Sequence, residues 1–430
     1  MSSHPNVIVF FTDQQRWDSM GIHGHPAGLT PNFDRVAAAG TFVKNSFTCQ
    51  PVCGPARSVL QTGKYATNTG CFRNSIPLPR EEKTLAHHFR EGGYDTAYIG
   101  KWHLASGDPV PAAERGGYQS WLASNILEFT SYAYDTVVYN EAEEAVKLPG
   151  YRVDALTDAA IRYIDQDHHK PYFMFLSFLE PHHQNQTDTY PAPFGYEDRL
   201  RGELQFPPDL AALGGSSKEH YPGYMGMIER LDEAFGRLIE ALHSLGQLDN
   251  TIILFSSDHG CHFKTRNSEY KRSCHESSIR VPTLFYGPGF TGRGTYEGML
   301  SLIDLPPTLL EATGLPVPPV MQGHSIFARL GETDPDENVF IQISESHVGR
   351  ALRTRRWKYE VVSPDGDGWN DKDSPFYVEA YLYDLDSDPY ELDNLVTSPA
   401  HAGVRAELQG QLIERMVAAG ESAPEIGPAA

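Results

Sequence analysis

Three apolar runs along the chain share one shape, because each of them stops abruptly at polar residues. Residues 6–11, 171–178 and 251–257 are almost continuously apolar. Runs of this length predict strands that are buried on both faces of a sheet. The polar residues that follow the three runs are Thr12-Asp13-Gln14, Glu180-Pro181-His182-His183 and Asp258-His259-Gly260.

Helical patterns lie between these predicted strands. They cover residues 84–91, 151–165 and 225–245. Buried strands separated by helices predict an α/β fold with a large, mostly parallel sheet flanked by helices. In such sheets, functional sites gather beyond the carboxyl ends of the strands. All three apolar runs end there in residues that bind metals or carry protons, which indicates an active site at this edge.

The last quarter of the chain has a different pattern. Segments 314–319 and 331–338 are rich in Pro, Gly and Asp and predict a boundary. The segments that follow predict three strands and a closing helix, at 339–343, 351–354, 357–362 and 401–418. We therefore expect a catalytic α/β domain over residues 1–335. A small C-terminal α+β domain with an antiparallel sheet should follow over residues 336–430.

The composition and charge of the chain exclude several classes of function. The 430 residues include 35 Lys and Arg against 56 Asp and Glu, a formal net charge of −21. This balance argues against nucleic acid and against an anionic membrane surface, because both are bound through clustered basic residues. No stretch approaches the roughly 18 apolar residues of a membrane span, and residues 1–6 lack the basic leader of a signal peptide. With only five cysteines, we expect a cytoplasmic enzyme.

The string Cys53-Gly54-Pro55-Ala56-Arg57 carries the most specific chemistry. Pro55 is typical of a first helical position, which places Cys53 just before a helix N-terminus. Free N–H groups and the helix dipole favour negative charge there. Arg57 falls on the same helix face and can reach the same anion. The alternative for such a pair is a buried small residue beside a surface arginine.

The residues that follow favour the chemical interpretation. With Thr62-Gly63, the string resembles the signature of the type I sulfatase family, Cys-x-Pro-x-Arg followed by a Thr-Gly pair. Residues 100–104, Gly-Lys-Trp-His-Leu, resemble the second signature of that family, and residues 383–395 resemble its C-terminal run. The resemblance implies an alkaline-phosphatase-like fold. It also implies that a separate formylglycine-generating enzyme oxidises Cys53 to formylglycine, whose aldehyde hydrate is the nucleophile.

A second constellation consists of Asp13, Gln14, Asp258 and His259. Two carboxylates and an amide oxygen at neighbouring strand ends suit a hard divalent cation. Each residue taken alone is equally compatible with an ordinary loop position. The resemblance places them where sulfatases hold Ca²⁺. The pairs Asp-Gln and Asp-His depart from the commonest pattern and resemble some carbohydrate and choline sulfatases and the phosphonate monoester hydrolases. Mn²⁺ and Mg²⁺ therefore stay open.

The same resemblance assigns roles to the remaining pocket residues. Lys101 bridges the hydrated aldehyde and the substrate, and Lys271 contacts the sulfate. His182 or Lys271 protonates the departing alcohol, while Asp258 accepts the proton of the attacking hydroxyl. His103 takes the proton of the second hydroxyl.

Other polar residues lie near the pocket in the sequence. His183 either touches substrate or faces away. Four residues between Asp258 and Lys271 either reach the alcohol part of the substrate or are plain loop residues: His262, Asn267, Glu269 and Tyr270.

An acidic protein needs a locally positive pocket to bind a sulfate. We expect a divalent ion with Arg57, Lys101, Lys271 and His103 to supply that charge. The sequence thus predicts a hydrolase of sulfate esters. The nearest alternative is a phosphonate monoester or phosphodiester hydrolase that uses the same site. A two-metal enzyme of the alkaline phosphatase kind lacks its additional His-rich ligand set here, and a catalytically silent anion-binding member is disfavoured by the intact signature.

Overall fold

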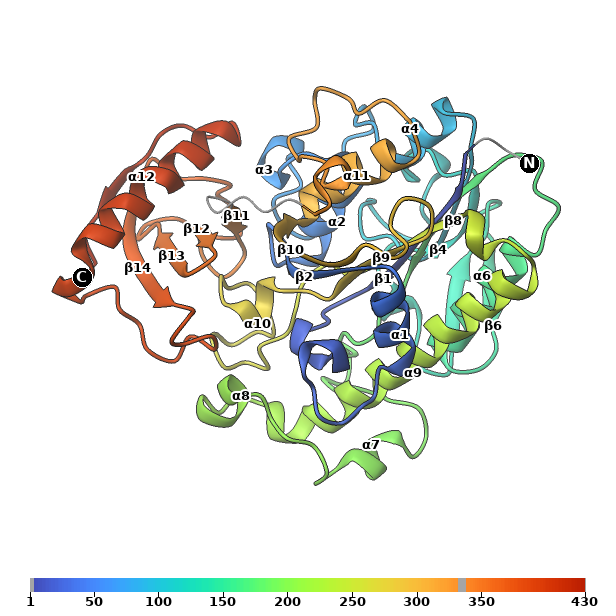
Figure 1. Cartoon of the computed structure of the whole chain (residues 1–430), viewed down its shortest axis with the longest axis horizontal. Helices are drawn as coiled ribbons and strands as arrows, with labels where there is room; N and C mark the ends of the chain where they lie inside the picture. The colour runs from blue at the N-terminus through green and yellow to red at the C-terminus, as the bar shows by residue number, and fades with distance from the viewer. Residues whose placement is uncertain (1–3, 332–337, 430) are drawn as a thin grey trace.

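A ten-stranded sheet organises most of the molecule, as the computed structural model shows for residues 4–331 and 338–429 (Figure 1). Its strand order is β10-β2-β9-β8-β1-β7-β3-β4-β5-β6. The strands are β1 Asn6–Thr12, β2 Thr41–Phe47, β3 Asp95–Lys101, β4 Ser120–Ser124, β5 Thr136–Tyr139, β6 Ala145–Leu148, β7 Tyr172–Ser177, β8 Thr251–Ser257, β9 Thr283–Tyr286 and β10 Gly294–Ser301.

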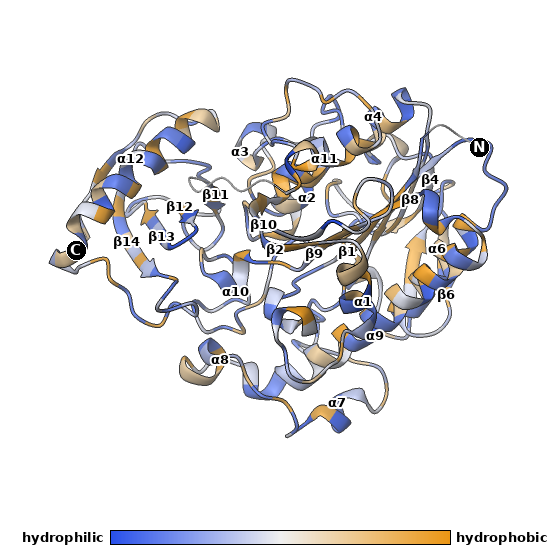
Figure 2. Ribbon diagram, in the orientation of Figure 1, coloured by the Kyte–Doolittle hydropathy of each residue, from blue (hydrophilic) through white to orange (hydrophobic). Residues whose placement is uncertain are grey.

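The centre of this sheet is parallel. Strand β1 pairs in parallel with both β7 and β8, so that Phe11 lies opposite Ser177 and Thr12 opposite Ser257. Antiparallel pairs occur where β9 joins β2 and β8, and at the β4-β5-β6 edge. The three apolar runs form β1, β7 and β8, and the central strands carry hydrophobic residues almost throughout (Figure 2). The predicted α/β fold is confirmed.

Helices cover both faces of the sheet (Figure 1). One hydrophobic core packs α2, α4 and α11 against the sheet, and a second packs α1, α6 and α9 against the opposite face. The helices are α1 Pro31–Ala39, α2 Cys53–Thr62, α3 Ala66–Thr69, α4 Leu85–Glu91, α5 Leu127–Thr130, α6 Arg152–Ile164, α7 Tyr196–Leu200, α8 Pro208–Ala212, α9 Ser217–Ser244, α10 Glu276–Ile279, α11 Leu305–Ala312 and α12 Ala402–Ala418.

The start of α9 departs furthest from the sequence-based prediction, and the start of α2 also differs from it. Helix α9 begins at Ser217 instead of residue 225, although Pro222 lies inside it and removes one backbone hydrogen bond. Burial of Tyr221 and Tyr224 on this early segment compensates for that loss. Helix α2 begins at Cys53 itself rather than after it, with Val52 in extended conformation as the N-cap.

A second, five-stranded sheet forms the C-terminal part, with the order β11-β12-β13-β14-β15. Its strands are β11 Asn338–Ile343, β12 Gly349–Thr354, β13 Trp357–Val362, β14 Phe376–Asp384 and β15 Glu425–Gly427. The first three pairs are antiparallel, as predicted, and α12 packs on one face. Sequence reasoning missed β14 and β15. The boundary expected at residue 335 lies outside the described residues.

Candidate active site

The predicted site residues converge at the carboxyl ends of the central strands. Asp13 follows β1, Asp258 follows β8, and Lys101 is the last residue of β3. The first turn of α2 brings Cys53 to the same edge. All four side chains are buried. Parallel register therefore brings together residues that are up to 245 positions apart in the sequence.

Asp13 is the centre of the charge network. Its Oδ2 accepts hydrogen bonds from Lys101 Nζ at 2.8 Å and from Arg57 Nη2 at 3.0 Å. Arg57 also donates to Asp258 Oδ2 at 3.3 Å and to Ser177 Oγ at 2.7 Å. Burial alone would raise the pKa of Asp13, but Lys101 and the other cationic groups hold it well below its usual value. Each buried charge thus has an opposite partner, as stable burial requires.

Among the described residues, one cluster has metal-ligand geometry. It consists of Asp13, Cys53, Asp258 and His259. One ligand atom from each lies within 4.8 Å of all the others. His259 Nδ1 lies 2.9 Å from the Gly260 carbonyl oxygen. This contact assigns the proton to Nδ1, which leaves the Nε2 lone pair free to bind a cation. His259 Nε2 is 3.6 Å from Asp258 Oδ1 and 3.7 Å from Asp13 Oδ1.

Gln14 fits the same cation site. Its Oε1 is buried and has no hydrogen-bond partner in the part of the chain that the structure describes. Its Nε2 donates to Tyr190 Oη at 2.9 Å, and its backbone N–H donates to Asp258 Oδ1 at 3.0 Å. Gln14 adopts a φ of 70°, a left-handed conformation that a non-glycine residue rarely keeps without support. A divalent cation would satisfy the unpartnered amide oxygen.

The Cys53 thiol faces this cluster. Its Sγ lies 2.8 Å from Lys271 Nζ and 3.2 Å from His259 Nε2. Burial and the Asp13 carboxylate oppose ionisation, but Lys101 and Lys271 outweigh them and lower the pKa of the thiol to about 7. A group at this position is therefore held among cations at a helix N-terminus, where negative charge is stabilised.

Lys271 and His182 form the opposite side of the pocket. Lys271 Nζ donates to His182 Nε2 at 3.1 Å, and His182 Nδ1 lies 2.6 Å from the His183 carbonyl oxygen. Burial, followed by the Lys271 charge, lowers the pKa of His182 well below its usual value. His182 is consequently neutral. The His183 ring stacks on His182 at 4.3 Å and lies 4.4 Å from the Tyr270 ring.

The charge of His103 differs from the predicted one. Burial, followed by the Lys101 charge, lowers its pKa to about 3, so His103 does not contribute to the positive charge of the pocket. Its Nδ1 is buried and unpartnered within the described structure. The side chain lines a cavity of about 290 Å³ together with Asn125, Ile126 and Phe129. Its backbone lies beside the first turn of α2, at Gly54.

Two of the four polar residues between Asp258 and Lys271 hold the local backbone in place. His262 Nε2 and Asn267 Nδ2 each lie 2.9 Å from the Lys271 carbonyl oxygen, so they fix the loop that carries this lysine. Tyr270 Oη donates to Asp188 at 2.8 Å, and Glu269 is exposed. These contacts account for His262, Asn267 and Tyr270 without a role in binding substrate.

Sequence reasoning missed two residues at the site. Glu128, on α5, accepts a hydrogen bond from Lys101 Nζ at 2.9 Å and is buried. Asn74 Oδ1 accepts the Gly54 N–H at 2.9 Å and so caps the first turn of α2. Neither residue belongs to a motif that we recognised. Only the folded chain brings them to the site.

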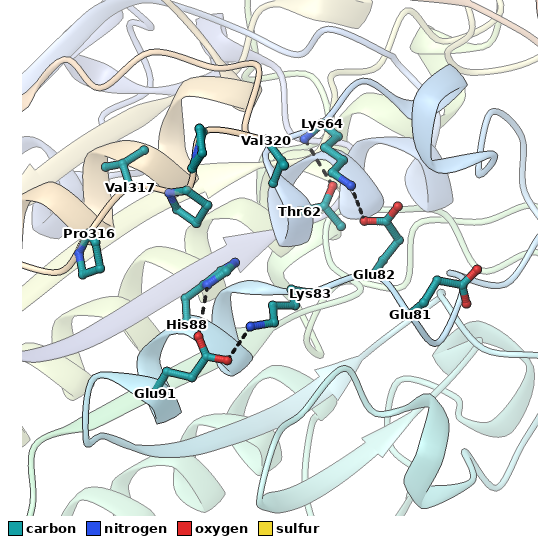
Figure 3. A pocket seen from close by; sticks show the side chains of 12 residues that line it. Thr62, Lys64, Glu81, Glu82, Lys83, His88, Glu91, Pro316, Val317 and Val320 are labelled. Carbon is teal, nitrogen blue, oxygen red and sulfur yellow. Dashed lines mark hydrogen bonds and ion pairs between the residues drawn. The ribbon is translucent and has the colours of Figure 1, made fainter.

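A larger cavity of about 450 Å³ lies elsewhere, between the C-terminal end of α2, α4 and the 316–320 loop (Figure 3). Four of its charged side chains form two ion pairs. Lys64 contacts Glu82 at 2.7 Å, and Lys83 contacts Glu91 at 2.6 Å. None of the predicted site residues lines it. Size alone therefore does not identify the active site of this chain.

At the carboxyl edge of the α/β sheet, the structure thus gathers a cluster with metal-ligand geometry, a thiol at a helix N-terminus and the buried side chains of Arg57, Lys101 and Lys271. Comparison with known proteins identifies the family. The family model described as Sulfatase matches residues 5–315. The chain belongs to the sulfatase family of sulfuric ester hydrolases. A second model, the C-terminal region of N-sulphoglucosamine sulphohydrolase, matches residues 268–418.

Individual relatives are similar over most of their length. An ulvan-active sulfatase from Formosa agariphila is 29% identical over 97% of this chain and 82% of its own. An N-acetylglucosamine-6-O-sulfatase from Bacteroides thetaiotaomicron is 25% identical over 96% of this chain and 86% of its own. The crystal structure of yidJ from Bacteroides fragilis superposes with a TM-score of 0.87 at 24% identity, covering 98% of this chain and 97% of that one.

The described helices include none with the length and apolar character that crossing a bilayer demands. All five cysteines are free thiols.

Proposed function

We propose that this sulfatase cleaves alcohol, carbohydrate or aryl sulfates with a formylglycine derived from Cys53 and with one divalent cation. The observation that carries the proposal is the position of Cys53. Its thiol stands at the start of α2, 2.8 Å from Lys271 and within the cluster formed by Asp13, Asp258 and His259. A formylglycine-generating enzyme would act on Cys53 during maturation. The hydrated aldehyde supplies two hydroxyls, one to attack sulfur and one to let sulfate leave.

The cation would be held by Asp13, Gln14, Asp258 and His259. Three of these four residues offer oxygen, which favours Ca²⁺, while the His259 nitrogen also suits Mn²⁺ or Mg²⁺. A bound divalent ion neutralises charge on the sulfate oxygens and favours ionisation of the attacking hydroxyl. Asp258, which has a carboxylate oxygen within 4.8 Å of Cys53 Sγ, would accept the proton of that hydroxyl.

Lys271 is the better candidate for protonating the departing alcohol. His182 is neutral, and its Nε2 accepts a hydrogen bond from Lys271 Nζ instead of offering a proton to substrate. In this arrangement Lys271 gives a proton to the alcohol oxygen as the S–O bond breaks. His182 orients Lys271 through the contact at 3.1 Å, and Lys271 regains its proton from water.

His103 serves the second half of the reaction. It is neutral, and its Nδ1 has no hydrogen-bond partner among the residues that the structure describes, so it can accept the proton of the remaining hydroxyl on residue 53. Loss of that proton releases sulfate and restores the aldehyde, to which water adds. The negative charge of the bound sulfate raises the affinity of His103 for a proton at this moment.

A phosphonate monoester or phosphodiester hydrolase remains the second candidate, because the pairs Asp13-Gln14 and Asp258-His259 also suit that reaction. The test is a side-by-side assay of aryl sulfate, aryl phosphonate and phosphodiester on enzyme whose conversion at Cys53 has been measured by mass. We expect the highest kcat/KM for the sulfate. A higher kcat/KM for either phosphorus ester would overturn the proposal in favour of the second candidate.

A further inference from the structure

Glu128 is a buried carboxylate whose ion-pair partner, Lys101, also pairs with Asp13, and its position needs an explanation. It belongs to α5 Leu127–Thr130 and is 3% exposed. Its backbone carbonyl accepts hydrogen bonds from the amides of Gln184 and Gln186, both at 2.7 Å. These glutamines follow His182 and His183 on the same loop. Glu128 is therefore fixed between the end of β3, which carries Lys101, and the loop that carries His182.

The two carboxylate oxygens of Glu128 have different surroundings. Oε1 accepts a hydrogen bond from Lys101 Nζ at 2.9 Å. Oε2 is buried and has no hydrogen-bond partner anywhere in the described chain. Burial opposes ionisation, but the Lys101 charge keeps the pKa of Glu128 below its usual value, so the group is ionised. A buried, ionised oxygen without a donor is costly and indicates a missing donor.

The donor is neither the sulfate nor the predicted cation. A sulfate ester carries no proton at neutral pH, and its oxygens repel a carboxylate. Among the described residues, the metal-binding cluster comprises Asp13, Cys53, Asp258 and His259 and does not include Glu128. The remaining part of a substrate is the alcohol, which must lie beside the sulfate. The contacts of its backbone carbonyl with Gln184 and Gln186 hold Glu128 beside the loop that carries His182 and His183.

We propose that Glu128 Oε2 accepts a hydrogen bond from an O–H or N–H group on the alcohol part of the substrate, close to the sulfated carbon. The inference rests on the proposed function and names its substrate class. The enzyme should prefer sulfate esters of polyhydroxy or amino alcohols, such as sugars, over esters without a neighbouring donor. Sites that hydrogen-bond a substrate hydroxyl discriminate strongly against analogues that lack it.

Glu128 also positions Lys101, and the experiment must separate the two roles. Loss of the contact with Lys101 should reduce the cleavage of every sulfate ester by a similar factor. Loss of a direct substrate contact should affect only esters that carry the donor. The comparison therefore uses monosulfated hexopyranosides with a free hydroxyl or amino group beside the sulfate, their deoxy analogues, and 4-nitrophenyl sulfate.

The variants are Glu128→Leu, which removes the acceptor, and Glu128→Gln, which keeps its shape and one carbonyl oxygen. For Glu128→Leu, kcat/KM for donor-bearing sugars should fall by about 10- to 150-fold more than kcat/KM for the deoxy analogues and for 4-nitrophenyl sulfate. For Glu128→Gln, the loss of kcat/KM on donor-bearing sugars should be smaller. Glu82→Gln, which removes a lysine partner at the remote cavity, is the matched control and should leave all substrates unchanged.

Thermal melting checks that the variants fold, and Glu128→Gln carries the test if Glu128→Leu does not. Equal losses on all esters would overturn the proposal and leave Glu128 as a positioning residue for Lys101. A parent enzyme that prefers the deoxy analogues would also overturn it. A parent that cleaves phosphorus esters and no sulfates would instead refute the proposed function. The two failures are thus distinguishable.

Discussion

The two sides of the pocket are built differently. The nucleophile wall consists of Asp13, Cys53, Arg57, Lys101, Asp258 and His259, which occupy strand ends and the first turns of α2. The leaving-group wall consists of His103, Glu128, His182, His183 and Lys271, which occupy loops and a four-residue helix. In the nucleophile wall, every charged side chain contacts another member. Within the described residues, the leaving-group wall has three unpartnered atoms, His103 Nδ1, Glu128 Oε2 and His183 Nδ1, whereas the nucleophile wall has one, Arg57 Nε.

This difference indicates which wall distinguishes one substrate from another. The charged groups of the nucleophile wall pair mainly with one another, and in the proposed function this wall binds the sulfate, which all substrates share. The leaving-group wall has more unpartnered polar atoms among the described residues, and in the proposed function these face the alcohol part of the substrate. Variants of the first should therefore affect all substrates equally, and variants of the second should distinguish among them.

The largest effect should follow from Asp13→Asn. The change leaves Arg57 and Lys101 without their shared buried partner and removes a cation ligand. We expect activity to disappear for every ester and the free energy of unfolding to fall by about 3–5 kcal/mol. Urea denaturation and assays on three esters check this, with the exposed Glu240→Gln as control. Retained activity on any one ester would contradict the uniform role of this wall.

Lys271→Met should give the next largest loss of activity. The size of this loss should depend on the leaving group. A general acid contributes about 10²- to 10⁴-fold, and mainly when the leaving alcohol is a weak acid. The loss should therefore be large for alkyl sulfates and much smaller for 4-nitrophenyl sulfate. Rates across a series of leaving groups measure it, with Lys264→Met on the same loop as control. An identical loss throughout the series would mean that Lys271 only binds the sulfate.

Removing the cation should lower both activity and stability. A ligand present at 100 times its dissociation constant stabilises the folded state by about 2.7 kcal/mol, so exhaustive chelation should reduce the melting temperature measurably. Restoring the ion should recover both properties, and metal analysis should find one ion per chain. Gln14→Leu should weaken the binding. Two tightly held zinc ions per chain, or full activity after chelation, would refute the single-cation site.

The smallest effect concerns the unconverted thiol. With a pKa of about 7, Cys53 is half thiolate at neutral pH, and its fraction of thiolate rises as pH rises through 7. Burial raises the pKa values of Cys49 and Cys71 to about 12 and that of Cys261 to about 11. Methyl methanethiosulfonate at pH 7 should modify Cys53 first. Lys271→Met should move the labelling curve to higher pH, and an unmoved curve would show that Lys271 does not stabilise the thiolate.

The nucleophile wall is also the side that sequence predicts better. Apolar runs that end in Asp13 and Asp258 mark strand ends, and parallel pairing brings such ends together whatever their distance in sequence. Glu128 has no comparable signal, because it lies in a four-residue helix and meets Lys101 only after folding. The neutral state of His103 was equally unpredictable, since it results from burial. The start of α9 was missed because buried aromatic residues override the tendency of Pro222 to end a helix.

The central claim is that residue 53 acts through two hydroxyls on one carbon, and Cys53→Ser tests it most directly. The serine hydroxyl can still attack sulfur and release the alcohol, but the serine sulfate has no second hydroxyl from which His103 can take a proton. A single-turnover assay followed by peptide mass mapping is the measurement. The account predicts at most one alcohol released per chain and a mass gain of one sulfuryl group on the peptide that carries residue 53. Sustained turnover by Cys53→Ser at a rate near that of the parent enzyme would contradict it.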